Sequence, residues 1–92
     1  MASGTIKTQS MSITGQLSTL GTSVYIPYPS GYTVNNCVVV GLMVELATNV
    51  WIASNYDNVN QVDAVLFETQ IAVGAKSSQV ANHNFRLILA KI

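Results

Sequence analysis

The apolar run from Cys37 to Leu46 is the feature of the sequence that most restricts the fold. It is rich in valine, whose branched Cβ favours extended strands over helices. The run is shorter than the roughly 18 apolar residues that a membrane-spanning helix needs. Gly41 lies in its middle, where a glycine marks a β-bulge or a close approach of another backbone. The run therefore predicts a long strand that is buried on both faces.

Turn signals divide the rest of the chain into further short strands. Pro29-Ser30-Gly31 favours a chain reversal, and Thr48-Asn49 marks the turn of a hairpin. The segment from Val62 to Val73 is either one long strand or two strands with a kink. Phe85 to Ile92 alternates its side chains between two faces and closes the chain. Strands are also expected at Thr5 to Ile13, Thr22 to Tyr28 and Val50 to Ser54, with a turn or short strand bracketed by Gly15 and Gly21.

Strands of this length and spacing predict an all-β fold. The commonest residues favour strands or turns over helices. About six to eight short strands in one chain are typical of a small antiparallel β-sandwich, and we expect one of jelly-roll type. No linker or repeat interrupts the sequence, so the expected organisation is a single β-sandwich domain over residues 1–92.

Very few charged side chains are available to cover the surface of so small a domain. Charged residues make up 9% of the chain and apolar residues 49%, whereas about 25% of the residues of an average soluble domain are charged. Either uncharged polar side chains cover the surface or part of it is hidden against other copies, and we expect a homo-oligomer. The net charge is 0 and only 4 residues are Lys or Arg. Binding to nucleic acid or to anionic membranes requires more cations than this.

The first residues, Met1 to Thr5, have neither the charged segment nor the apolar segment of a signal peptide. We therefore expect synthesis in the cytoplasm and no membrane insertion. A protein of this kind leaves the cell only as part of a larger assembly.

No residue pattern in the sequence points to catalysis or to a bound metal or cofactor. Cys37 is the one cysteine, so it forms no internal disulfide and is expected to be a small buried hydrophobe. His83 is the one histidine and is expected in a solvated loop, because a zinc site needs several converging ligands. The four acids are expected on the surface. A small glycosidase, which needs a pair of carboxylates, is the enzymatic alternative. We expect a protein that is not an enzyme and has no cofactor.

One stretch is rich in oxygen atoms, which calcium prefers as ligands. It lacks the spacing of an EF-hand and its closing glutamate, so a polar loop between strands is the better account. The stretch comprises Asn55, Asp57, Asn58, Asn60 and Asp63.

Aromatic and polar residues occur close together in the same region, as they do in carbohydrate sites. Sugar rings pack on aromatic faces, and amides and carboxylates bind the hydroxyl groups. Trp51 lies one short strand ahead of the polar stretch, and a second polar segment runs from Asn82 to Asn84. The alternative is that Trp51 and the tyrosines fill the core or a subunit interface. The candidate ligand-binding residues are Trp51, Asn55, Tyr56, Asp57, Asn58, Asn60 and His83.

Two segments carry a resemblance to a known group of proteins. The stretch from Tyr28 to Val40 contains Tyr-Pro-Ser-Gly-Tyr-Thr followed by Asn-Cys-Val-Val, and the chain ends in Phe85 to Ile92 with an apolar-Lys-apolar triplet. Both segments resemble tail-fibre or baseplate tip domains, the receptor-binding heads of phages and prophages of Gram-positive bacteria. The stretch from Asn55 to Asn84 matches poorly, so no binding residue is carried over.

The resemblance implies a β-sandwich head that assembles as a homotrimer within the virion, next to other tail proteins. It implies attachment to a host-surface polysaccharide or teichoic acid, without catalysis. The chain is short for a tip that joins a tail, which leaves an accessory or decoration protein of the virion as another possibility. A purely structural virion or surface protein that contacts only protein is the second hypothesis.

Overall fold

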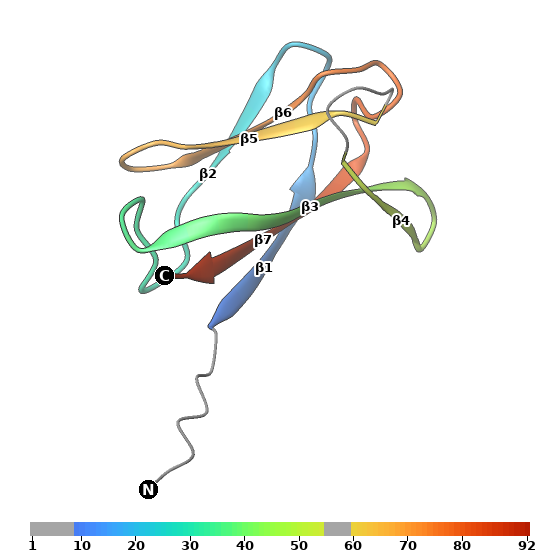
Figure 1. Cartoon of the computed structure of the whole chain (residues 1–92). Coiled ribbons are helices and arrows are strands. Elements are labelled where there is room, and N and C mark those ends of the chain that lie inside the picture. The colour runs from blue at the N-terminus through green and yellow to red at the C-terminus, as the bar shows by residue number, and fades with distance from the viewer. Residues whose placement is uncertain (1–8, 55–59) are drawn as a thin grey trace, which may run out of the picture.

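Seven strands make up the regular secondary structure of the computed structural model, which describes residues 9–54 and 60–92 (Figure 1). None of the described segments forms a helix long and apolar enough to cross a bilayer. The strands are β1 (Ser10–Gln16), β2 (Ser23–Ile26), β3 (Cys37–Ala47), β4 (Val50–Ala53), β5 (Val62–Leu66), β6 (Ile71–Ala75) and β7 (Asn84–Lys91).

The strands form two antiparallel sheets that are consistent with a β-sandwich. One sheet has the order β1-β7-β3-β4 and the other the order β2-β6-β5. We call them the four-stranded and the three-stranded sheet. The prediction of a small all-β protein with antiparallel sheets is confirmed at this level.

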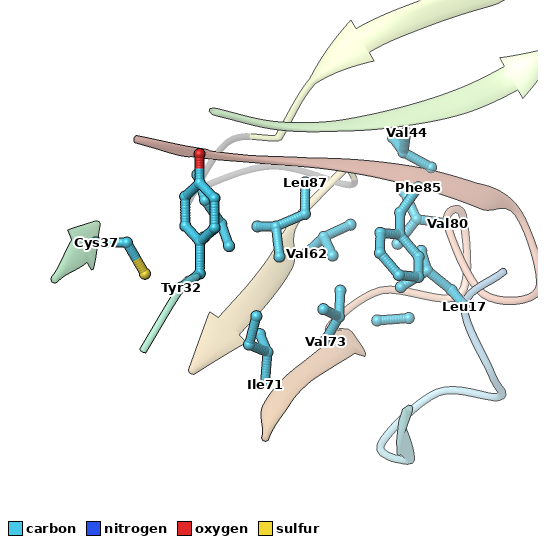
Figure 2. Packing of buried hydrophobic residues seen from close by; sticks show 12 residues of the cluster. Leu17, Tyr32, Cys37, Val44, Val62, Ile71, Val73, Val80, Phe85 and Leu87 are labelled. Atoms are coloured by element: carbon cyan, nitrogen blue, oxygen red, sulfur yellow. The ribbon is translucent and has the colours of Figure 1, made fainter. Parts of the chain in front are cut away.

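The core lies between the two sheets. Phe85, Leu87 and Leu89 of β7 are fully buried, and they alternate with side chains on the outer face of the four-stranded sheet. In Figure 2, Phe85 lies near Val80 and Leu17 at one end of the core, and Tyr32 and Cys37 lie at the other. Since every second residue of β7 enters the core, the alternation predicted for the last strand is confirmed.

β3 corrects the prediction of a strand buried on both faces. Cys37 and Val44 are buried, but Val38 to Val40 are exposed. The exposed valines are consecutive, so side chains on both faces of this part of β3 reach solvent in the described chain. A register shift between Val39 and Gly41 confirms the bulge that the glycine predicted.

The region from Val62 to Val73 contains a full chain reversal rather than a kink. β5 and β6 pair antiparallel, with Leu66 opposite Ile71. The N–H of Phe67 donates to the carbonyl of Gln70 at 2.9 Å and closes the turn. The expected turns at Pro29-Ser30-Gly31 and at Thr48-Asn49 are confirmed: Gly31 has φ 85° and Asn49 has φ 62°.

Gly15 lies inside β1 and not in a turn, because the core requires a residue without a side chain there. A Cβ at Gly15 would lie 2.8 Å from Cε2 and Cζ of Phe85. Gly15 is opposite Phe85 in the β1–β7 register, so the aromatic ring occupies the space above the glycine. β1 therefore continues to Gln16, beyond the strand end predicted at Ile13.

Candidate functional site

A polar hollow of about 410 Å³ opens beside the β3–β4 hairpin. It collects residues from three separate parts of the chain, which come together where β1 and β3 end and β7 begins. Most of its surface is polar. The residues that line it are Gln16, Glu45, Leu46, Ala47, Thr48, Asn82, His83 and Asn84.

The strand register explains why these residues meet. Gln16 of β1 is opposite Asn84 of β7, Asn84 is opposite Glu45 of β3, and Glu45 is opposite Trp51 of β4. Residues in register across a sheet share one face. We call Gln16, Asn84, Glu45 and Trp51 the outer row, since they cross all four strands on the face opposite to the core.

Glu45 is the centre of the hydrogen bonding around the hollow. Its Oε1 accepts a hydrogen bond from Nδ2 of Asn84 at 2.9 Å, and its Oε2 accepts one from the backbone N–H of Asn49 at 2.8 Å. These two hydrogen bonds hold the pKa of the Glu45 carboxyl below its ordinary value, and the one from the Asn84 amide has the larger effect. A general acid needs a raised pKa at neutral pH, so Glu45 is suited to holding a polar ligand rather than to donating a proton.

His83 lies in the loop before β7, where it is half-buried. Its Nδ1 lies 2.9 Å from the backbone oxygen of Glu45. A carbonyl oxygen only accepts, so Nδ1 carries the proton in this contact and Nε2 of the neutral ring is an acceptor. Two hydrogen bonds hold the residue before His83: Gln16 Nε2 donates to the Asn82 oxygen at 3.0 Å, and the Asn82 N–H donates to the Ser18 oxygen at 3.1 Å.

Trp51 extends the polar surface with an aromatic ring. The Arg86 guanidinium carbon lies 4.2 Å from the centre of the Trp51 ring. Arg86 is on β7 and Trp51 on β4, so the stack bridges across β3. A cation above an indole face stabilises an exposed pair by about 0.5–1 kcal/mol. This stack favours one orientation of the ring next to Glu45.

Of the residues predicted from the sequence, the structure brings Trp51 and His83 to the same surface. Trp51 is in register with Glu45, and His83 contacts the backbone of Glu45. Asn60 is half-buried at the edge of a described segment. The remaining four, Asn55, Tyr56, Asp57 and Asn58, lie outside the described residues.

Sequence reasoning missed Gln16, Glu45, Asn49 and Arg86. One signal could have found Glu45: it is the only charged residue within the apolar run from Cys37 to Leu46. An ionisable group in such a strand must have a specific environment. Gln16 and Arg86 have no such signal, because only the strand register places them beside Glu45 and Trp51.

The oxygen-rich stretch that suggested calcium is described only at Asn60 and Asp63. Asp63 Oδ2 lies 3.9 Å from Lys76 Nζ, and Asp63 Oδ1 accepts from Gln61 Nε2 at 3.3 Å. Within residues 9–54 and 60–92, no three His, Cys, Asp or Glu side chains converge.

A second hollow of about 550 Å³ lies between β3 and β5. Val39, Val40 and Val65 contribute apolar surface to it. The hydroxyl of Ser54 is already engaged with Val62, accepting from its N–H at 2.8 Å and donating to its carbonyl at 3.0 Å. This hollow is more apolar than the one beside Glu45, and we take the more polar one as the candidate site.

The lowered pKa of Glu45 gives a testable pH dependence. Because the carboxyl binds its proton less readily in the folded state, ionised Glu45 stabilises the protein above its unfolded-state pKa, and this stabilisation is lost as the pH falls through the lower folded-state pKa. We expect Glu45→Gln to be less stable than the wild type at neutral pH. The difference should shrink below about pH 4. Urea unfolding of both proteins over this range is the measurement, and a difference that stays constant with pH would contradict the assignment.

No family model matches the chain, and no curated protein or solved structure matches it either.

Proposed function

We propose that this chain is a non-enzymatic protein of phage tail type that binds host-surface glycan through the outer row and the polar hollow beside it. The observation that carries the proposal is the outer row itself, which sets two amides, an ionised carboxylate and an indole ring side by side on one face. Amides and carboxylates bind sugar hydroxyl groups in pairs, and an indole face packs on the apolar face of a sugar ring.

The fixed geometry of the row favours binding. Glu45 accepts two hydrogen bonds, and the Trp51 ring is stacked on Arg86. Side chains that are already ordered lose less conformational entropy when a ligand binds. Such preorganisation matters for a glycan, whose individual contacts are weak.

The charges near the hollow favour one class of glycan. Glu45 is the acidic side chain in its lining, and Arg86 is engaged with Trp51. A negatively charged phosphate beside an ionised carboxylate is repelled. We therefore propose an uncharged, hydroxyl-rich polysaccharide as the ligand rather than a teichoic acid with its backbone phosphates.

We propose further that the protein is a homotrimer with a jelly-roll-like sandwich, located in the virion next to other tail proteins. The scarcity of charge and the exposed apolar side chains support oligomer formation. The chain alternates between the sheets at both ends, from β1 to β2 and from β6 to β7, as it does in jelly rolls. Three sites on one particle raise the overall affinity for a repeating polymer.

A glycan array tests the function. The native oligomer is expected to bind uncharged polysaccharides and not polyol-phosphate polymers. Asn84→Ala removes the amide between Gln16 and Glu45 and should weaken glycan binding about tenfold. A hydrogen bond to a charged group contributes about 1.5–3 kcal/mol. The lower end of this range applies to an exposed site, and it corresponds to about a tenfold change in affinity.

Gln70→Ala is the matched control for the array, because Gln70 is an exposed amide in the β5–β6 turn whose backbone alone makes the turn hydrogen bond. It should bind like the wild type. Equal loss in both variants, or no glycan bound by the wild type, would count against the proposed function.

One observation favours the second hypothesis, a structural protein that contacts only protein. Val38, Val40 and Val65 are 40%, 58% and 48% exposed, and exposed valines of this kind are typical of surfaces that another protein covers. Under this hypothesis the array stays empty, and substitutions at these valines change assembly.

A further inference from the structure

The outer edge of β1 exposes a regular row of backbone hydrogen-bonding groups. β1 is the first strand of the four-stranded sheet, and among the described strands it pairs with β7 alone. At the two ends of this pairing, the Lys91 N–H donates to the Gln9 oxygen at 2.9 Å, and the Leu17 N–H donates to the His83 oxygen at 2.8 Å. Antiparallel strands alternate these partners, so odd-numbered residues face β7. The N–H and C=O groups of the even-numbered residues therefore point away from the sheet, at Ser10, Ser12, Thr14 and Gln16.

The other edges of the described sheets carry features that hinder strand addition. β2 and β4 have four residues each, and Pro27 follows β2 directly. β5 carries Asp63, which pairs with Lys76. The part of β3 that β4 leaves uncovered contains the bulge at Val40. Short length, proline, charge and bulges are the devices that protect edges from pairing.

β1 has none of these devices. Its seven residues contain no charge and no proline, and its register with β7 continues without a shift from Ser10 to Gln16. A long, regular and uncharged edge is a template for another extended strand.

We infer that β1 pairs antiparallel with β1 of a second copy around a two-fold axis at Ile13. This register aligns all seven residues of both strands and lets the outward groups of Ser12 bond with those of Thr14 in the partner copy. Hydroxyl side chains then face each other on the outer face, a favourable cross-strand pair. The two Ile13 side chains meet on the inner face, where each is already half-buried.

The sequence of β1 is self-complementary in this arrangement. Met11, 40% exposed in the single chain, lies opposite Gly15 of the second copy and meets no bulky side chain there. No like charges approach, since the strand carries none. An isologous contact needs a surface that matches itself, and β1 meets this requirement.

This contact goes beyond the proposed function and is independent of glycan binding. The β1 contact has two-fold symmetry, so it joins two single chains, or two rings of chains, to each other. A trimer held together by other surfaces becomes an assembly of six chains when the β1 edges pair, and a chain without a three-fold contact becomes a dimer. The native mass is therefore an even multiple of 9.8 kDa.

Ser12→Pro tests the contact by light scattering behind a sizing column. Proline removes the outward N–H of residue 12 and leaves the bonds to β7 intact, because edge strands tolerate proline where the N–H points to solvent. The native mass should fall to half of the wild-type value. The double variant S12K/T14K keeps both N–H groups and places lysines opposite each other across the axis, and it should halve the mass as well.

Ser30→Pro is the control, since residue 30 lies in the turn before Gly31, where proline is favoured. Its mass should equal that of the wild type. A wild-type mass of one or three chains would overturn the β1 contact, and the value for three chains would at the same time support the proposed trimer. An unchanged mass in a folded S12P and in S12K/T14K would overturn it too. A glycan array without binding does not affect these mass measurements, so it counts against the proposed function and not against the β1 contact.

Discussion

Replacing Phe85 by alanine is expected to lower the free energy of unfolding by about 3–5 kcal/mol, the usual cost of removing a buried aromatic side chain. Phe85 has no exposed surface and lies in the core beside Val44, Val80 and Leu17 (Figure 2). Small domains are stable by about 5–15 kcal/mol in total. The variant should therefore lose a large fraction of its stability. Urea unfolding of both proteins at equal concentration measures the difference.

Gly15 provides an internal control for this result. In the wild type, Gly15→Ala places a Cβ against the Phe85 ring and should cost about 1–3 kcal/mol through overpacking. In the Phe85→Ala background the ring is absent, and the same substitution should cost much less. If the loss of unfolding free energy in the double variant equals the sum of the losses in the two single variants, the two residues do not contact each other.

This contact illustrates what the sequence could and could not predict about the fold. The alternation of Phe85, Leu87 and Leu89 depends on neighbouring residues alone and was predicted correctly. The role of Gly15 depends on a residue that is distant in the chain, so a glycine that fits beneath an aromatic ring looked like a turn. For the same reason the apolar character of β3 did not reveal that Val38 to Val40 are exposed.

The candidate site divides in the same way. The sequence pointed to Trp51 and to the segment around His83 because aromatic and amide side chains have recognisable chemistry. It did not connect them. Their connection is Glu45, which is in register with Trp51 and contacts His83 through its carbonyl. A strand register is set by the turn geometry and by the hydrophobic pattern of the whole sheet, and a short stretch of sequence does not contain it.

Trp51→Ala is expected to weaken glycan binding at least about tenfold, because a central indole in a binding site commonly contributes more than 1 kcal/mol. The substitution removes the apolar end of the outer row and also the partner of Arg86. Loss of that stack should cost the fold only about 0.5–1 kcal/mol. The protein should therefore remain folded, with a native mass equal to that of the wild type. Glycan titration and light scattering on the same sample measure both properties.

Trp51→Phe separates the ring from its surroundings. Phenylalanine keeps an aromatic face for the sugar and for Arg86, so binding should be largely retained. If Trp51 instead serves a purely structural assembly, the alanine variant changes the native mass and glycan binding is absent from all three proteins. Loss of the Trp51 ring thus lowers glycan affinity under the first hypothesis and changes the native mass under the second. The position of Trp51 in register with Glu45, next to a polar hollow and on the face opposite to the core, is why we expect affinity to respond and mass to remain constant.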